Sequence, residues 1–127
     1  MNNRLAIALL FISSLFSISG HTATYSFGSA AVLEVELPPN DPQVFYNFLL
    51  WKVRGTCEVI SDAPQNPLSF KMLNNKGTLD GVEFAEGSSL SLVASAGQKF
   101  QLVAEPRAKV EITNHGDVTV KIHCASN

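Results

Sequence analysis

The sequence is poor in charge, in cysteine and in tryptophan. Only 16% of the 127 residues are charged, whereas an average soluble domain has about 25%. Nine Lys and Arg against eleven Asp and Glu give a net charge of -2, which excludes the broad basic surface needed for non-specific nucleic-acid binding. The hydrophobic share of 46% argues against disorder. The length fits one domain rather than two.

Short catalytic motifs are also missing. The chain has no Gly-x-Ser-x-Gly elbow, no Cys-x-x-Cys pair and no glycine-rich phosphate loop. His115, Asp117 and His123 are the one group that resembles a set of metal ligands. On a strand, Asp117 and His123 would lie roughly 20 Å apart and could not share an ion. We therefore predict no metal, no cofactor and no catalysis; the alternative is a secreted hydrolase without a local motif.

The apolar residues are concentrated at the N-terminus. A polar start with one cation is followed by an apolar run over residues 5–18, and then by small and polar residues as far as Ala23. This order is typical of a secretory signal peptide, and the run is shorter than the about 20 residues of a membrane span. We predict a signal peptide over 1–23, cut between 19 and 23, and an exported domain over 24–127 without a membrane span.

Export determines how the two cysteines, Cys57 and Cys124, are interpreted. Disulfides persist in oxidising compartments, and two cysteines allow only one intramolecular pairing. A zinc site would need two further ligands. We therefore predict a disulfide between Cys57 and Cys124.

Alternation with period two dominates the chain from Ala31 onward and predicts an all-β fold. One such pattern places Cys57 on the same face as Trp51, Val53 and Val59, and another places Cys124 with Val118, Val120 and Ile122. Both cysteines are thus predicted to face the core. Glycine-containing turns separate the patterns, and we expect these short connections to make consecutive strands antiparallel neighbours.

These patterns predict a single antiparallel β-sandwich of seven or eight short strands. The expected strands are 31–37 at a sheet edge, 51–60, 68–73, 78–84, 89–94, 99–104, 109–113 and 118–124. Immunoglobulin domains pack a disulfide against a tryptophan that lies between the cysteines in sequence, whereas Trp51 precedes Cys57. We therefore expect an immunoglobulin-like layout, without membership of that family.

The segment before Trp51 has two interpretations. Asp41 and Pro42 could begin a short helix that extends to Asn47, but the apolar run 44–51 fits a strand equally well. We favour a strand from about Phe48.

The same run contains the candidate partner surface. Its aromatic residues would serve as core. Alternatively, alternation places Tyr46, Phe48 and Leu50 on the face opposite Trp51, where an exposed apolar patch would mark a binding surface.

Together these features predict a small, exported, non-catalytic module that binds a protein or ligand, or has a structural role, in the periplasm or extracellular space. Recognition would use a sheet face or an edge strand such as 31–37. The absence of an Asn-x-Ser/Thr site and the short length fit a bacterial origin.

Overall fold

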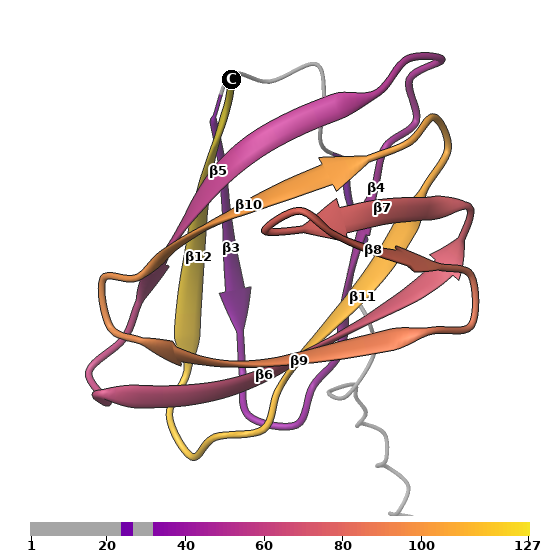
Figure 1. Cartoon of the computed structure of the whole chain (residues 1–127). Coiled ribbons are helices and arrows are strands. Elements are labelled where there is room, and N and C mark those ends of the chain that lie inside the picture. Colours follow the sequence, from indigo (N-terminus) through magenta and orange to yellow (C-terminus); the bar gives the residue numbers. More distant parts are fainter. Residues whose placement is uncertain (1–23, 27–31) are drawn as a thin grey trace, which may run out of the picture.

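The computed structural model describes residues 24–26 and 32–127 (Figure 1). The predicted signal peptide over 1–23 and its cut lie outside the described residues. Within them there are eleven strands and no helix. The strands are β2 (Thr24–Ser26), β3 (Val32–Leu37), β4 (Gln43–Tyr46), β5 (Val53–Ile60), β6 (Gln65–Asn74), β7 (Lys76–Leu79), β8 (Val82–Ala85), β9 (Ser89–Ser95), β10 (Lys99–Ala104), β11 (Lys109–Asn114) and β12 (Val120–Ser126).

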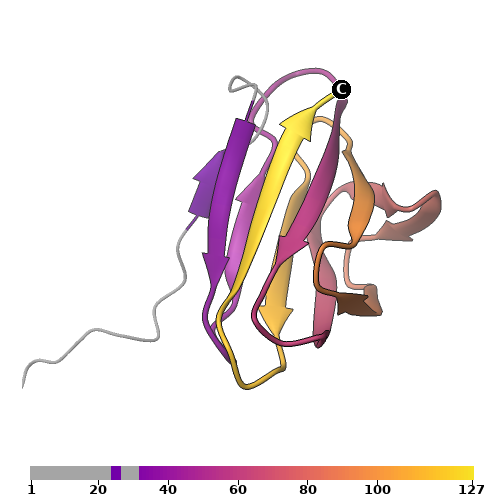
Figure 2. The ribbon, with the colours of Figure 1, turned by 90° about the vertical axis from the view of Figure 1, so that its left-hand side faces the viewer.

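The strands form two sheets that pack face to face (Figure 2). One sheet has the order β3-β12-β5-β10-β7-β8 and the other β2-β4-β11-β6-β9. All neighbouring strands are antiparallel except β2, which runs parallel to β4. The predicted β-sandwich is therefore confirmed, with eleven described strands rather than seven or eight.

The connections differ from the prediction. Of the consecutive described strands, only β7 and β8 are neighbours in one sheet, and the other connections cross to the opposite sheet. The expectation that short turns pair consecutive strands was wrong. The physical reason is the distance that a short turn can span. Four extended residues cover about 13 Å, which exceeds the roughly 10 Å between packed sheets, so such a turn can also join strands of opposite sheets.

Eight of the strands trace a jelly roll. When β2, β7 and β8 are left out, the remaining eight strands can be counted from one to eight in chain order. One sheet then has the order first, eighth, third and sixth (β3-β12-β5-β10), and the other has the order second, seventh, fourth and fifth (β4-β11-β6-β9). This winding between two four-stranded sheets is the jelly-roll arrangement. It differs from the expected immunoglobulin-like layout, in which several consecutive strands pair within a sheet.

Residues 78–84, predicted as one strand, form a hairpin. Asp80 and Gly81 have positive φ angles of 49° and 83° and join Leu79 to Val82, which pair across the turn. Positive φ at both central residues is the requirement of a two-residue hairpin turn, which Asp-Gly meets well. The Asp-Gly dipeptide was the sequence signal for this turn.

The segment before β5 also departs from the sequence-based expectation. Residues 43–46 form β4, which pairs with β11, so of the two interpretations of this segment the short helix after Asp41 is excluded. A strand from Phe48 was also wrong, because residues 47–52 form a loop and β5 begins only at Val53.

The core lies between the two sheets and contains the alternating apolar positions of both. At its centre Phe70 of β6 and Phe100 of β10 meet edge to face, with ring centroids 5.6 Å apart. The predicted disulfide is present, and Cys57 and Cys124 are buried, as the alternation indicated. They lie directly opposite each other on β5 and β12 of one sheet, so the bond joins two adjacent strands and not the two layers.

Replacing both Cys57 and Cys124 by Ala should lower the free energy of unfolding by about 2–4 kcal/mol, because the bond closes a long loop. Urea denaturation of the variant and the parent protein measures the difference. Mass analysis of the parent should show two thiols only after reduction. Equal urea midpoints and slopes for both proteins would contradict the expected contribution.

Candidate functional site

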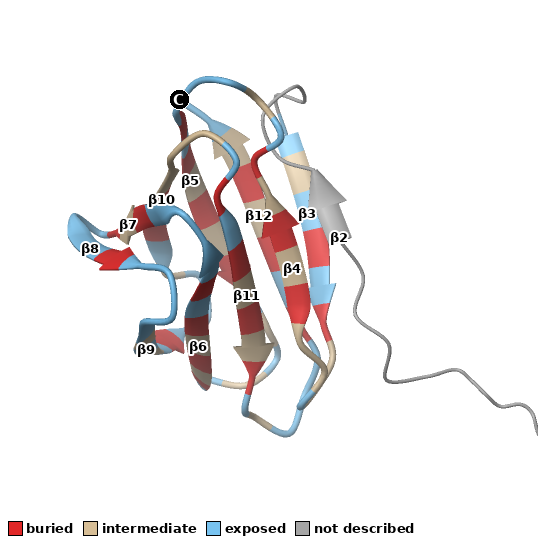
Figure 3. Ribbon diagram, turned by 90° about the vertical axis from the view of Figure 1, so that its right-hand side faces the viewer, coloured by how far each residue is buried: buried red, intermediate tan, exposed pale blue. Residues whose placement is uncertain are grey.

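The connection between β4 and β5 carries an unusual set of exposed apolar side chains. This 47–52 loop passes over one end of the sandwich, and most of it is exposed (Figure 3). Phe48 is 40% exposed, Leu50 71% and Trp51 63%. We call these three residues the apolar tip. Leaving them in water has a cost, because burying each such side chain would gain about 1.5–3 kcal/mol.

A buried asparagine fixes the shape of this loop. Asn47 is 2% exposed, and its side-chain amide donates to the backbone carbonyls of Trp51, Ala104 and Glu105 at 3.0, 3.2 and 3.1 Å. Its side-chain oxygen accepts a hydrogen bond from the Leu49 amide at 3.0 Å. Asn47 thus ties both halves of the loop to the neighbouring turn between β10 and β11.

Two further contacts hold the loop against the sandwich. The Asn47 backbone amide donates to the Ala108 carbonyl at 2.9 Å, and Leu49 packs against the core from its partly buried position. Lys52 forms an ion pair with Glu105 at 3.3 Å. Leu49 points inward while its neighbours remain exposed. The apolar tip is therefore exposed while the loop is attached to the sandwich, and its exposure does not result from detachment of the loop.

The exposed apolar surface differs in two residues from the partner surface that the sequence suggested. Phe48 and Leu50 are exposed, and Tyr46 is half-buried on β4, where the ammonium of Lys109 lies 5.2 Å from its ring centroid. The placement of Trp51 on the inward face was wrong, because the loop is not a strand and Trp51 belongs to the exposed set. The binding role of these residues stays a prediction.

Sequence reasoning missed Asn47, and no local signal marks it. An Asn in an apolar run carries no motif, and its three carbonyl acceptors include two from residues 57 and 58 positions away. Two of its hydrogen-bond acceptors therefore come close to Asn47 only in the folded domain, where the ends of β4 and β10 lie together at one end of the sandwich.

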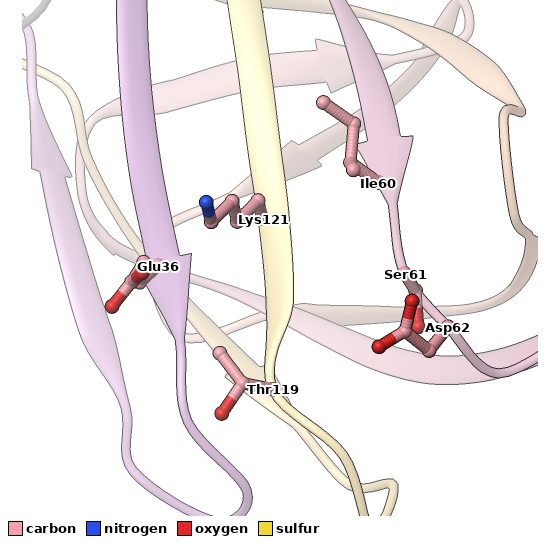
Figure 4. A pocket seen from close by; sticks show the side chains of 6 residues that line it. All are labelled: Glu36, Ile60, Ser61, Asp62, Thr119 and Lys121. Atoms are coloured by element: carbon pink, nitrogen blue, oxygen red, sulfur yellow. The ribbon is translucent and has the colours of Figure 1, made fainter.

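A shallow pocket of about 450 Å³ lies near the opposite end, on the outer face of the six-stranded sheet (Figure 4). It is lined by Glu36, Ile60, Ser61, Asp62, Thr119 and Lys121. Its charged side chains are accessible to water, and the Ser61 hydroxyl is already used, since it donates to Asn66 Oδ1 at 2.7 Å. The pocket thus presents ordinary solvated groups.

One serine and one histidine lie at the distance of a nucleophile and its base. Ser69 Oγ on β6 is 2.8 Å from His115 Nε2 in the turn after β11. A catalytic triad also needs a carboxylate that orients the imidazole. In the part of the chain that the structure describes, no carboxylate forms a hydrogen bond or ion pair with His115.

The remaining candidates from the sequence are His123 and the edge strand β3. His123 lies 3.8 Å from Glu34 across β12 and β3, and β3 is an edge strand as expected. Within residues 24–26 and 32–127, no group of three or more His, Cys, Asp and Glu is arranged to hold a metal ion. The same residues contain no helix with the length and hydropathy of a membrane span.

Comparison with known proteins adds no relative. No protein-family model, no curated protein and no solved structure matches the chain.

Asn47→Ala should lower the free energy of unfolding by about 2–3 kcal/mol, because it leaves buried carbonyls without a donor. Asn74→Ala is the matched control, since Asn74 donates one bond to the Arg107 carbonyl from an exposed position, and it should cost about 1 kcal/mol or less. Urea denaturation measures both, and hydrogen exchange at the Leu49 amide should accelerate only in the Asn47 variant. Equal effects of the two changes would show that Asn47 does not hold the loop.

Ser69 should not react with a fluorophosphonate probe, because without an oriented base its hydroxyl is not activated. Intact-mass analysis after incubation with the probe checks this, with a known serine hydrolase as the positive control. A covalent adduct that disappears in Ser69→Ala would instead support the hydrolase alternative.

Proposed function

We propose that the protein is an exported, non-catalytic binding module that contacts its partner through the apolar tip of the 47–52 loop. The observation that carries this proposal is the fixed exposure of Phe48, Leu50 and Trp51 on a loop anchored by Asn47. Contiguous exposed apolar groups on a soluble domain mark interaction sites. The loop replaces the sheet face or edge that the sequence suggested as the contact.

Rigidity strengthens this proposal. A binding loop that is already ordered loses little conformational entropy on association, so more of its contact energy appears as affinity. The Asn47 hydrogen bonds and the inward Leu49 side chain provide such order. A loop that merely connected two strands would have no need to hold its largest apolar side chains outward.

The edge strand β3 is a weaker contact surface. Its outward Glu34 and Glu36 are charged, as is typical of edges protected against pairing, and Glu34 is engaged with His123. Export is supported by the buried disulfide, since such bonds persist in oxidising compartments, and by the signal-peptide pattern over 1–23.

Photo-crosslinking at the loop tests the proposal. With benzoylphenylalanine at position 50, we expect an adduct with a protein or a lipid in cells that make the protein, and we expect Trp51→Ser to remove it. The control places the same crosslinker at Thr119, an exposed residue that lines the pocket near the other end. Equal adducts at the two positions, or none at position 50, would rule out the apolar tip as the contact surface.

A further inference from the structure

The charges of the molecule are distributed unevenly around the apolar tip. Five of the eight cations in residues 32–127 lie on the 47–52 loop or on the strand ends and the turn next to it: Lys52, Arg54, Lys76, Arg107 and Lys109. Three acids lie beside them, since Glu105 and Glu83 pair with Lys52 and Lys76 and Glu86 follows Ala85, which is opposite Lys76. This leaves a local excess of two positive charges. The rest of the domain has three cations and eight acids, an excess of five negative charges.

Hydrogen bonds and shared surfaces place these cations around the loop. Arg54 lines the same small pocket as Trp51 and Lys52. Arg107 belongs to the turn between β10 and β11, to which Asn47 is bonded. The Glu105 amide of that turn donates to the carbonyl of Lys76 at 3.1 Å, which brings the start of β7 to the same end.

Pairing of the acids leaves free positive charge. Glu105 is engaged with Lys52, and Glu83 with Lys76 at 3.2 Å. Among the described residues, Arg54, Arg107 and Lys109 form no ion pair with a carboxylate. The apolar tip is therefore bordered by three cations that have no acidic partner among the residues that the structure describes, although the domain as a whole is acidic.

This combination fits one kind of partner. A standard protein interface uses about 20–30 residues on each side, whereas the tip is three side chains on one narrow loop. Aromatic and aliphatic side chains on a protruding element, bordered by Lys and Arg, are suited to the boundary between lipid headgroups and acyl chains. Anionic lipids attract the bordering cations and repel the acidic remainder, which would orient the domain with its tip toward the bilayer.

We propose that Phe48, Leu50 and Trp51 insert into the surface of an anionic phospholipid bilayer, with Arg54, Arg107 and Lys109 at the lipid headgroups. This inference rests on the proposed function and names its partner. It requires no conformational change of the domain, since the tip is already exposed and the loop already anchored.

Trp51 supplies the probe for the test, because it is the only tryptophan of the chain. Its fluorescence therefore reports on this loop alone, whatever the N-terminal segment does. With vesicles of phosphatidylcholine and 30% phosphatidylglycerol, we expect a blue shift of its emission and quenching by brominated acyl chains. Vesicles of pure phosphatidylcholine should produce at least about tenfold weaker binding, since each cation contributes near an anionic surface.

Variants separate the apolar and the electrostatic contributions. Leu50→Asp should weaken binding at least about tenfold, whereas Val93→Asp, at an exposed apolar residue of β9, should not. Replacing Arg54 and Arg107 by Gln should weaken binding to the anionic vesicles about tenfold. Replacing Lys99 and Lys121 by Gln removes the same charge elsewhere and should have little effect.

The outcomes distinguish this inference from the function on which it rests. If neither vesicle changes Trp51 emission while crosslinks at position 50 still identify a protein, the lipid partner is wrong and the binding module stands. If Trp51 emission stays unchanged and position 50 forms no adduct, both are wrong. Equal binding to neutral and anionic vesicles would overturn the role of the cations.

Discussion

The pairing of β12 with both β3 and β5 is the constraint on which the rest of the sandwich depends. β3 is joined to its sheet only through β12, and these two strands come from opposite ends of the described domain. The disulfide between Cys57 and Cys124 fixes the register of β12 on β5. Long-range pairings are costly to close because chain entropy is lost before contacts are gained, and a covalent link across 67 residues reduces that cost in the oxidised chain.

The jelly-roll winding also produces the candidate binding surface. Because β4 and β5 lie in different sheets, the chain must cross the end of the sandwich between them. Asn47 holds this crossing by bonding to carbonyls of β10 and of the turn that follows it. The direction of the loop is thus determined by the layers that it connects, and the apolar tip is presented outward on a fixed base.

The few charges of the domain are distributed unevenly. The cations gather at the end that carries the apolar tip, whereas most acids lie elsewhere on the sandwich. Such a separation gives the domain an orientation in the field of a negatively charged surface. The charges would then turn toward the negatively charged surface the same end of the domain whose apolar tip supplies the binding energy.

Local sequence patterns determined the all-β class, the buried positions of both cysteines and most strand positions, and 99–104 was predicted with the same bounds as β10. These follow from alternation, which is a property of neighbouring residues. The Asp80-Gly81 hairpin was also encoded locally and was overlooked. Strand order, the exposure of Trp51 and the role of Asn47 were decided by the tertiary structure alone. A short turn can join strands within a sheet or between sheets, and the partners of Asn47 lie more than fifty residues away.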